Sequence, residues 1–279
     1  MTGAPFDLVI LGCDGELVDG ERSIDRTVAG VTRVLDGLTS RGIALCVASH
    51  LPRARVDRAL SVTDLARYCG DRVYTASLVP RGKPLPDLFL YAAARMAIEP
   101  WRCAVIADSE RGVQAAIAAG MSVFGMDELP ALLESDPGLH AGRPADHAAE
   151  SEPATRLRDA YGAFAAGDGR LLAELLAEDV TYHLPGRHLG GGSLRGRAEV
   201  FARTAKAAQS CDAPPSIRLQ GVVGSGDVVL SIERFVARRG ERTVDQDVCV
   251  VWRMAGARCV EIWSTFSDQA SCDRFWEDG

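Results

Sequence analysis

In the first half of the chain, short apolar runs alternate with segments whose apolar residues recur every three or four positions. Runs that are apolar throughout are typical of strands buried on both faces of a sheet, and the periodic segments are typical of the helices that join such strands. The pattern therefore predicts an α/β domain whose parallel sheet is covered by helices on both sides. The predicted strands are residues 6–11, 43–48, 104–107 and 122–124, and the predicted helices are residues 28–39, 86–98 and 113–119.

In the second half, helices come first and strands follow, which is typical of an α+β domain. The segment between the halves, residues 134–153, contains three prolines and no sustained apolar period, so it is interpreted as a linker. We therefore expect one domain over residues 1–133 and another over residues 154–279. The second domain's predicted helices are 155–166, 171–177 and 197–208, with strands at 180–184 and near 217–223, 228–237, 243–253 and 259–267.

Composition narrows the classes of partner. The chain has 279 residues and a formal net charge of −7, which argues against a nucleic-acid or anionic-membrane partner. Its eight cysteines include no C-x-x-C pair, so we predict free thiols of a cytoplasmic protein and no zinc site. No basic leader precedes the first apolar run, and no stretch of 18 consecutive residues is apolar. We therefore expect a protein that is not exported and does not span a membrane.

Four motifs occur in order in the first domain. They are residues 7–21 (DLVILGCDGELVDGE), 42–49 (GIALCVAS), 81–87 (RGKPLPD) and 105–121 (VIADSERGVQAAIAAGM). Together they resemble the motifs of haloacid dehalogenase-like hydrolases over about 120 residues. The resemblance implies a Rossmann-like fold with its site at the carboxyl ends of the strands.

In that family an aspartate attacks a phosphoryl group, a second is acid and base, Ser or Thr and Lys hold the phosphate, and further acids help bind Mg²⁺. The resemblance assigns the last three roles to Asp14, Ser49, Lys83 and Asp108. Glycine at position 12 and alanine at position 107 stand where the nucleophile and the first acid of the fourth motif are expected. We therefore expect a disarmed hydrolase-like domain with no cofactor, apart from weakly held Mg²⁺ at the two aspartates.

Two further features bear on that domain. About 35 residues separate Asp14 from Ser49, too few for the helical cap that relatives with this first motif insert there. Lys83 is one of two lysines among the 31 lysines and arginines of the chain. An ammonium group retained against this bias serves either to neutralise acids of the former site or to bind an anion.

The second domain resembles the SnoaL-like polyketide cyclases and ketosteroid isomerases, which share the nuclear-transport-factor-2-like fold. The resemblance rests on residues 156–185 (helix, GD turn, helix, short strand), the strand meander and residues 260–276 (VEIWSTFSDQASCDRFW). It implies a curved-sheet cone around an apolar cavity, and a homodimer. The positions of the ketosteroid isomerase base and oxyanion acid fall near Leu184 and near Cys249 or Val250, so that activity is not expected.

Other residues could supply acid–base chemistry in the cavity. Tyr161 faces the sheet, either as a core residue or lining the cavity, and His183 lies beside the turn at Pro185. Asp247 and Trp263 are the remaining candidates. The strand parity is open: one alternative points Glu233, Asp245, Asp247, Glu261 and Trp263 inward, and the other Arg234, Gln246, Ile262, Ser264 and Asp268.

The leading hypothesis is a cyclase, isomerase or dehydratase of specialised metabolism that acts on a small apolar organic substrate in the second domain. One alternative is a Mg²⁺-dependent phosphate-ester hydrolase with an atypical nucleophile. The other is a binding or scaffold protein without catalysis, which differs from the first hypothesis only in lacking a polar pair inside the cavity.

Overall fold

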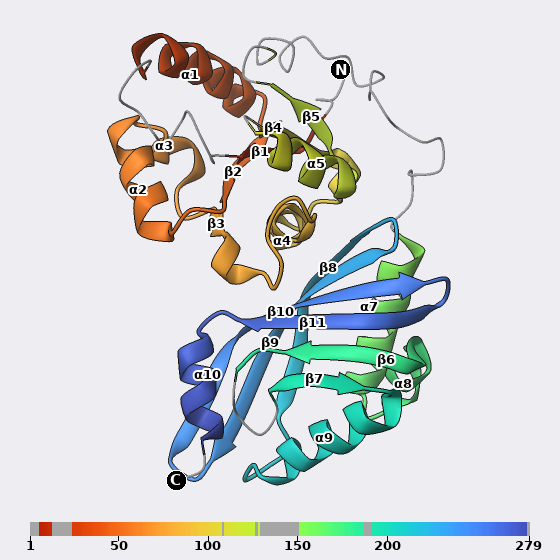
Figure 1. Ribbon diagram of the computed structural model, residues 1–279. Coiled ribbons are helices and arrows are strands. Elements are labelled where there is room, and N and C mark those ends of the chain that lie inside the picture. Colours follow the sequence, from red (N-terminus) through yellow and green to blue (C-terminus); the bar gives the residue numbers. More distant parts are fainter. Residues whose placement is uncertain are drawn as a thin grey trace. The chain divides into compact units, whose positions relative to one another are not determined.

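The computed structural model describes residues 6–12, 24–107, 109–125, 128, 151–186 and 191–277, with the backbone alone for residues 24–30. The chain divides into two compact units, one on each side of the segment between residues 128 and 151. Figure 1 shows a helix-flanked parallel sheet in the first unit and a mixed sheet with helices in the second.

The first unit is a Rossmann-like α/β fold, as predicted. Its five parallel strands lie in the order β3-β2-β1-β4-β5. The strands are β1 (Leu8–Gly12), β2 (Ala44–Ser49), β3 (Val73–Thr75), β4 (Cys103–Ala107) and β5 (Ser122–Phe124). The helices are α1 (Ile24–Ser40), α2 (Arg53–Val62), α3 (Ala66–Cys69), α4 (Asp87–Met96) and α5 (Glu110–Ala118).

The two faces of this sheet pack against different helices. Val9 and Leu11 of β1 share a buried cluster with Val34 and Leu38 of α1, and α2 contributes to the same cluster. On the alternate positions of β1, Leu8 and Ile10 are fully buried, and α4 packs against β1, β2 and β3. The sequence analysis missed α2, α3 and β3, because α2 is rich in charge and β3 has only three residues.

The second unit is an α+β fold built on a six-stranded sheet with the order β7-β6-β11-β10-β9-β8. Only the pairing of β6 with β11 is parallel. The strands are β6 (Leu176–Leu184), β7 (Gly192–Arg195), β8 (Ser216–Ser225), β9 (Val228–Arg239), β10 (Arg242–Ala255) and β11 (Arg258–Phe266). The helices are α7 (Glu152–Ala165), α8 (Arg170–Leu175), α9 (Arg197–Gln209) and α10 (Gln269–Trp276).

One face of the second sheet forms the core of that unit. Leu157 of α7, Val200 of α9 and Phe275 of α10 belong to the same buried cluster as Val250 and Trp252 of β10. The sequence analysis extended the second helix to residue 177, whereas α8 ends at Leu175 and β6 begins directly after it. The strand β7 was missed because it lies beside a glycine-rich run.

Two expectations of the sequence analysis concern the whole chain. Within the described ranges, no helix combines the length and the apolar character that a membrane crossing requires. The described cysteines are free thiols. The homodimer and the cytoplasmic location stay predictions.

A buried ion pair fixes the start of α4. Nε and Nη2 of Arg81 donate to Oδ2 and Oδ1 of Asp87 over 2.9 and 2.8 Å, and the Asp87 side chain has no exposed surface. We predict that Asp87→Ala lowers the free energy of unfolding of the first unit by about 3 kcal/mol, because it strands the guanidinium without its carboxylate. Urea unfolding measures this. Asp57→Ala, which removes an exposed pair with Arg53, is the control and should change stability by less than about 1 kcal/mol.

Candidate active site

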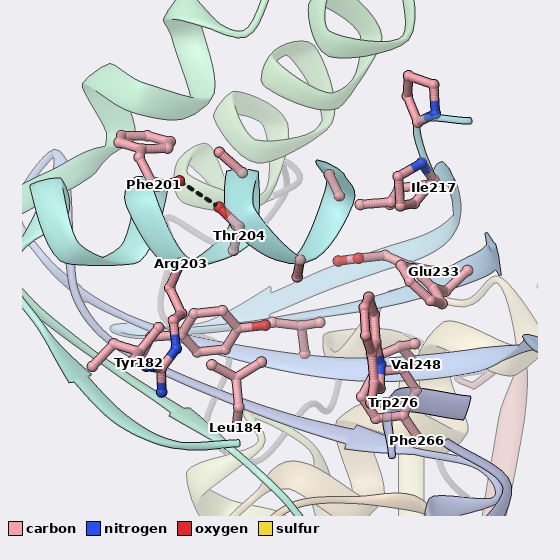
Figure 2. A pocket seen from close by; sticks show the side chains of 18 of the residues that line it. Tyr182, Leu184, Phe201, Arg203, Thr204, Ile217, Glu233, Val248, Phe266 and Trp276 are labelled. Atoms are coloured by element: carbon pink, nitrogen blue, oxygen red, sulfur yellow. Dashed lines mark hydrogen bonds between the residues drawn. The ribbon is translucent and has the colours of Figure 1, made fainter. Parts of the chain in front are cut away.

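A pocket of about 490 Å³ opens on the core face of the second sheet (Figure 2). Helix α9 forms one wall, the strands β6, β9 and β10 form another, and the end of α10 contributes Trp276. Its surface is mostly aromatic and aliphatic, as in pockets that bind apolar organic molecules. Among the described residues that line it, four have polar or charged side chains: Tyr182, Arg203, Thr204 and Glu233.

Glu233 is the acid of this pocket. Alternation along β9 places Ser231, Glu233 and Phe235 on the same face of the sheet. The carboxyl is buried, with 6% of the residue exposed. Its Oε1 accepts hydrogen bonds from the hydroxyl of Tyr161 on α7 and from Ser231 Oγ, the latter over 2.8 Å. Trp252 Nε1 donates in turn to Ser231 Oγ over 2.9 Å, which fixes the serine.

The two oxygens of this carboxyl have different surroundings. Both hydrogen bonds end on Oε1, and the described residues donate none to Oε2. Glu233 lines the pocket, and Oε2 is the oxygen that these two hydrogen bonds leave for a bound molecule. Anchoring one oxygen while leaving the other toward the ligand orients the carboxyl as a proton acceptor.

Burial raises the pKa of Glu233 to about 7, and the hydrogen bonds from Tyr161 and Ser231 lower it in part. Burial also raises the pKa of Tyr161 well above its ordinary value, and the neighbouring Glu233 adds to that rise. A carboxyl with a pKa near neutrality exchanges a proton readily under physiological conditions, which suits a general acid or base.

Tyr182 is the second polar group in the pocket. Burial raises its pKa to about 12, so its hydroxyl stays protonated at neutral pH. Tyr182 and Glu233 both reach into the pocket from the sheet (Figure 2). A hydrogen bond from Ser264 lowers the pKa of Tyr182 in part, because the serine donates to the phenol oxygen. A phenol that accepts one hydrogen bond can still donate its own proton to a bound oxygen.

The candidate Tyr161 lies beside the pocket acid. It is 8% exposed, it packs edge to face with Trp252 at a centroid distance of 6.3 Å, and its hydroxyl is satisfied by Glu233. Tyr161 is not part of the pocket surface. It is therefore a core residue that contacts the acid rather than the ligand space.

The structure places the candidates Asp247 and Trp263 away from the pocket, which excludes the alternative that points them inward together with Glu233. The register pairs Val248 with Glu233, so Asp247 points to the opposite face, where it binds Arg234 Nη1 over 3.0 Å. The ring of Trp263 also lies on that face, stacked on His183. The sequence analysis grouped Glu233 with these residues because the offset between neighbouring strands is invisible in one strand's alternation.

His183 also lies away from the pocket. Its Nδ1 is 2.9 Å from Ser193 Oγ, its Nε2 is 3.0 Å from Glu261 Oε1, and its ring stacks on Trp263 with centroids 5.3 Å apart. Its strand neighbours Tyr182 and Leu184 face the pocket instead. Because successive side chains of a strand alternate, the structure separates His183 from Glu233 and Tyr182.

Glu233 was named only as part of an open parity, and Tyr182 was missed altogether. A signal for Glu233 exists in the sequence, since it interrupts the apolar run VVLSI of β9 and is followed by Phe235 after one residue. A carboxyl inside such a run has a large desolvation penalty, so its presence indicates a role beyond packing.

In the first unit, the carboxyl ends of β1 and β4 meet at the site expected for phosphoryl chemistry. Gly12 pairs directly with Ala107, so the two positions without their expected carboxylates are cross-strand neighbours. A Cβ on Gly12 would stand 2.9 Å from the Ile106 carbonyl oxygen and 3.7 Å from Lys83 Nζ. The neighbouring backbone therefore occupies the space that a side chain at position 12 would need.

The phosphate-holding candidates are both buried. Ser49 has no exposed surface, and its Oγ accepts from the backbone N–H of Leu51 over 3.2 Å. Lys83 is 4% exposed, and its Nζ donates to the Ala48 carbonyl over 3.1 Å and lies 4.6 Å from the centre of the Phe89 ring. Asp14 and Asp108 lie outside the described residues.

The described residues at this edge supply few ligands for a magnesium ion, and the aspartates to which weakly held Mg²⁺ is assigned, Asp14 and Asp108, are not among them. Mg²⁺ requires several oxygen ligands in octahedral geometry, and the positions of Gly12 and Ala107 supply no side-chain oxygen. Across the described ranges, no group of three or more His, Cys, Asp or Glu residues is arranged to hold a metal.

Comparisons with known proteins agree with both halves of the fold. The family model of haloacid dehalogenase-like hydrolases matches residues 6–120, and that of SnoaL-like domains matches residues 157–262. The bifunctional riboflavin kinase/FMN phosphatase of Arabidopsis thaliana is 34% identical over 38% of this chain and 28% of its own. This chain thus spans little more than a quarter of that enzyme.

Two further similarities cover nearly the whole of smaller proteins. The uncharacterized protein Mb0035 of Mycobacterium bovis is 30% identical over 43% of this chain and 92% of its own length. The solved structure of Bal32a, from a soil-derived mobile gene cassette, is 31% identical, covers 45% of this chain and 96% of its own, and has a TM-score of 0.42.

The pKa of Glu233 predicts a pH-dependent stability. Its pKa is higher in the folded state than the ordinary 4.5, so the stability that it contributes is present below pH 4.5 and is lost as pH rises through 7. In Glu233→Gln this loss is absent. We therefore predict that the free energy of unfolding of the variant, minus that of the wild type, rises by about 3 kcal/mol between pH 4.5 and 8.

Urea unfolding at several pH values measures this difference, and Glu261→Gln on the opposite face is the matched control. Burial acts to raise the pKa of Glu261, but hydrogen bonds from Arg253 and His183 outweigh it and the net shift is downward. The control difference should therefore not rise with pH. A flat profile for Glu233→Gln would contradict the raised pKa.

Proposed function

Because the chain joins a member of the haloacid dehalogenase-like hydrolase family to a SnoaL-like domain, we propose that the second unit is an acid–base enzyme of the cyclase, isomerase or dehydratase type. Its substrate is a small, mostly apolar organic molecule. The observation that carries this proposal is Glu233, a buried carboxyl that lines an apolar pocket, has a pKa of about 7 and accepts both of its hydrogen bonds at Oε1.

Proton abstraction next to a carbonyl is the step that this arrangement supports best. Oε2 of Glu233 removes the proton, while Oε1 stays anchored by Tyr161 and Ser231. The developing enolate oxygen accepts a hydrogen bond from the neutral hydroxyl of Tyr182, which would place its negative charge beside a donor in a dry site. Glu233 then returns the proton to another carbon in an isomerisation, to the oxygen that becomes an alkoxide on ring closure in a cyclisation, or to the leaving hydroxyl in a dehydration.

The apolar walls support the chemistry as well as the binding. They exclude water from the carboxyl, and this exclusion is the cause of its raised pKa. A base whose conjugate acid has a pKa near 7 is half ionised at neutral pH and still holds a proton strongly enough to abstract one. Tyr161, Ser231 and Trp252 act as positioning residues, since they touch the acid or one another and not the pocket.

Deuterium exchange tests this proposal. In D₂O, the protein should catalyse exchange of the α-protons of a cyclic aryl ketone such as 2-tetralone, followed by NMR. Because the base must be ionised, kcat/KM should rise with pH through about 7 and then level. Glu233→Gln should lower kcat/KM by about 100-fold or more, and Tyr182→Phe by about 10- to 100-fold.

The control is Glu261→Gln, which changes an acid on the opposite face and should leave exchange unchanged. A rate that falls above pH 7 would instead identify Glu233 as the general acid of a dehydratase-type step. Binding of ketones without exchange in the wild type would favour the non-catalytic alternative and overturn the proposed chemistry.

We further propose that the first unit has lost phosphoryl transfer. The support is the Gly12–Ala107 pair, which offers no nucleophile and no metal ligand, and the buried hydrogen bond of Lys83 to the Ala48 carbonyl. The role of Lys83 is then structural, since its hydrogen bond ties the loop that carries it to the end of β2. The similarity to haloacid dehalogenase-like hydrolases covers residues 6–120, and a shared fold does not by itself imply a shared activity.

Phosphate release with Mg²⁺ from aryl and sugar phosphates checks this second proposal. We expect the wild type to release no more phosphate than Ser49→Ala or Lys83→Met, with thermal melting used to show that each variant is folded. Mg²⁺-dependent release by the wild type that both substitutions abolish would overturn the proposal and favour the phosphate-ester hydrolase.

A further inference from the structure

Arg203 places a permanent positive charge on the wall of an otherwise apolar pocket. It belongs to α9, and its half-buried side chain extends from that helix toward the part of the pocket formed by Tyr182 and Leu184 (Figure 2). A guanidinium group stays charged at all physiological pH values and carries five N–H donors in a planar fork.

This charge does not serve the pocket acid. The interactions that act on Glu233 are burial and the hydrogen bonds from Tyr161 and Ser231, and Arg203 is not among them. An arginine paired with this carboxyl would hold it ionised and lower its pKa, whereas the pKa is raised. The positive charge and the acid therefore occupy separate parts of the pocket.

The rest of the pocket surface indicates the shape of a ligand that lies between Arg203 and Glu233. Phe235, Phe266 and Trp276 line the pocket. Phe164 and Phe201 also line it, yet 38% and 41% of these residues stay exposed. Large apolar side chains left in solvent at a pocket mark a place where a ligand covers them. Aromatic walls pack best against flat rings.

We propose that the pocket binds a fused-ring aromatic carboxylate, with the ring system between the aromatic side chains and the carboxylate on the guanidinium of Arg203. The inference rests on the proposed function and specifies its substrate class. Arginine suits this role because its planar fork matches both oxygens of a carboxylate, and because its stem can lie on apolar surface. The carboxylate fixes which carbon of the ring system faces Glu233 Oε2.

A pair of probes that differ only in charge tests the inference. Naphthalene-2-carboxylate and naphthalene-2-carboxamide have the same shape, and their Kd values can be measured by calorimetry on the full chain at pH 6, where Glu233 is mostly protonated. The wild type should bind the carboxylate at least tenfold more tightly than the amide. Arg203→Met should weaken the carboxylate about tenfold or more and the amide less than twofold.

The matched control is Lys206→Met, which removes a cation from the same helix outside the pocket surface and should leave both Kd values unchanged. Arg203→Lys should restore part of the preference for the carboxylate. Equal affinity for the two probes, or equal weakening of both by Arg203→Met, would overturn the anionic substrate class. Ketone exchange by the wild type would still support the proposed function in that case, so the two failures are distinguishable.

Discussion

The second unit depends on one buried acid and the two hydroxyl groups that hold it. Glu233 is removed from water by the helices that pack on the inner face of the sheet, and this removal destabilises its charged form. Tyr161 and Ser231 compensate in part, because they donate to Oε1. The same packing that forms the core thus sets the proton affinity of the acid, so stability and reactivity are linked at this residue.

The sequence predicts the backbone elements better than it predicts the residues of the site. Apolar runs and helical periods identified β1, β2, β4, β5 and the long helices of both units, because burial imposes those patterns directly on the sequence. The elements α2, α3, β3, β7 and α10 were not predicted, because short or charged segments carry too few apolar positions. The second motif predicts a strand that ends near Ser49, and β2 ends at that residue. For the acid of the second unit, the sequence left two strand parities open.

The cause of that ambiguity is the register. Alternation within β9 and within β10 shows which residues share a face of one strand. Relating the two strands requires their offset, which depends on the turn between Arg239 and Arg242 that joins them. Pairing of Val248 with Glu233 sends Asp247 to the opposite face. In the first unit, likewise, the motifs marked Gly12 as a departure, but only the structure shows that the Ile106 carbonyl occupies the space of its Cβ, so a restored aspartate would require the backbone to move.

Helix α10 has a consequence for anyone who isolates the second unit. The matched SnoaL-like region covers residues 157–262, yet Phe266 and Trp276 line the pocket, and Ala154, Cys272 and Phe275 belong to the core. A fragment cut at the limits of the match would lack one wall of the pocket and the first turn of α7, the helix that carries Tyr161. It would admit water to Glu233, and its carboxyl would titrate like that of an ordinary surface glutamate. Inactivity of such a fragment would therefore report where the chain was cut rather than what the protein does.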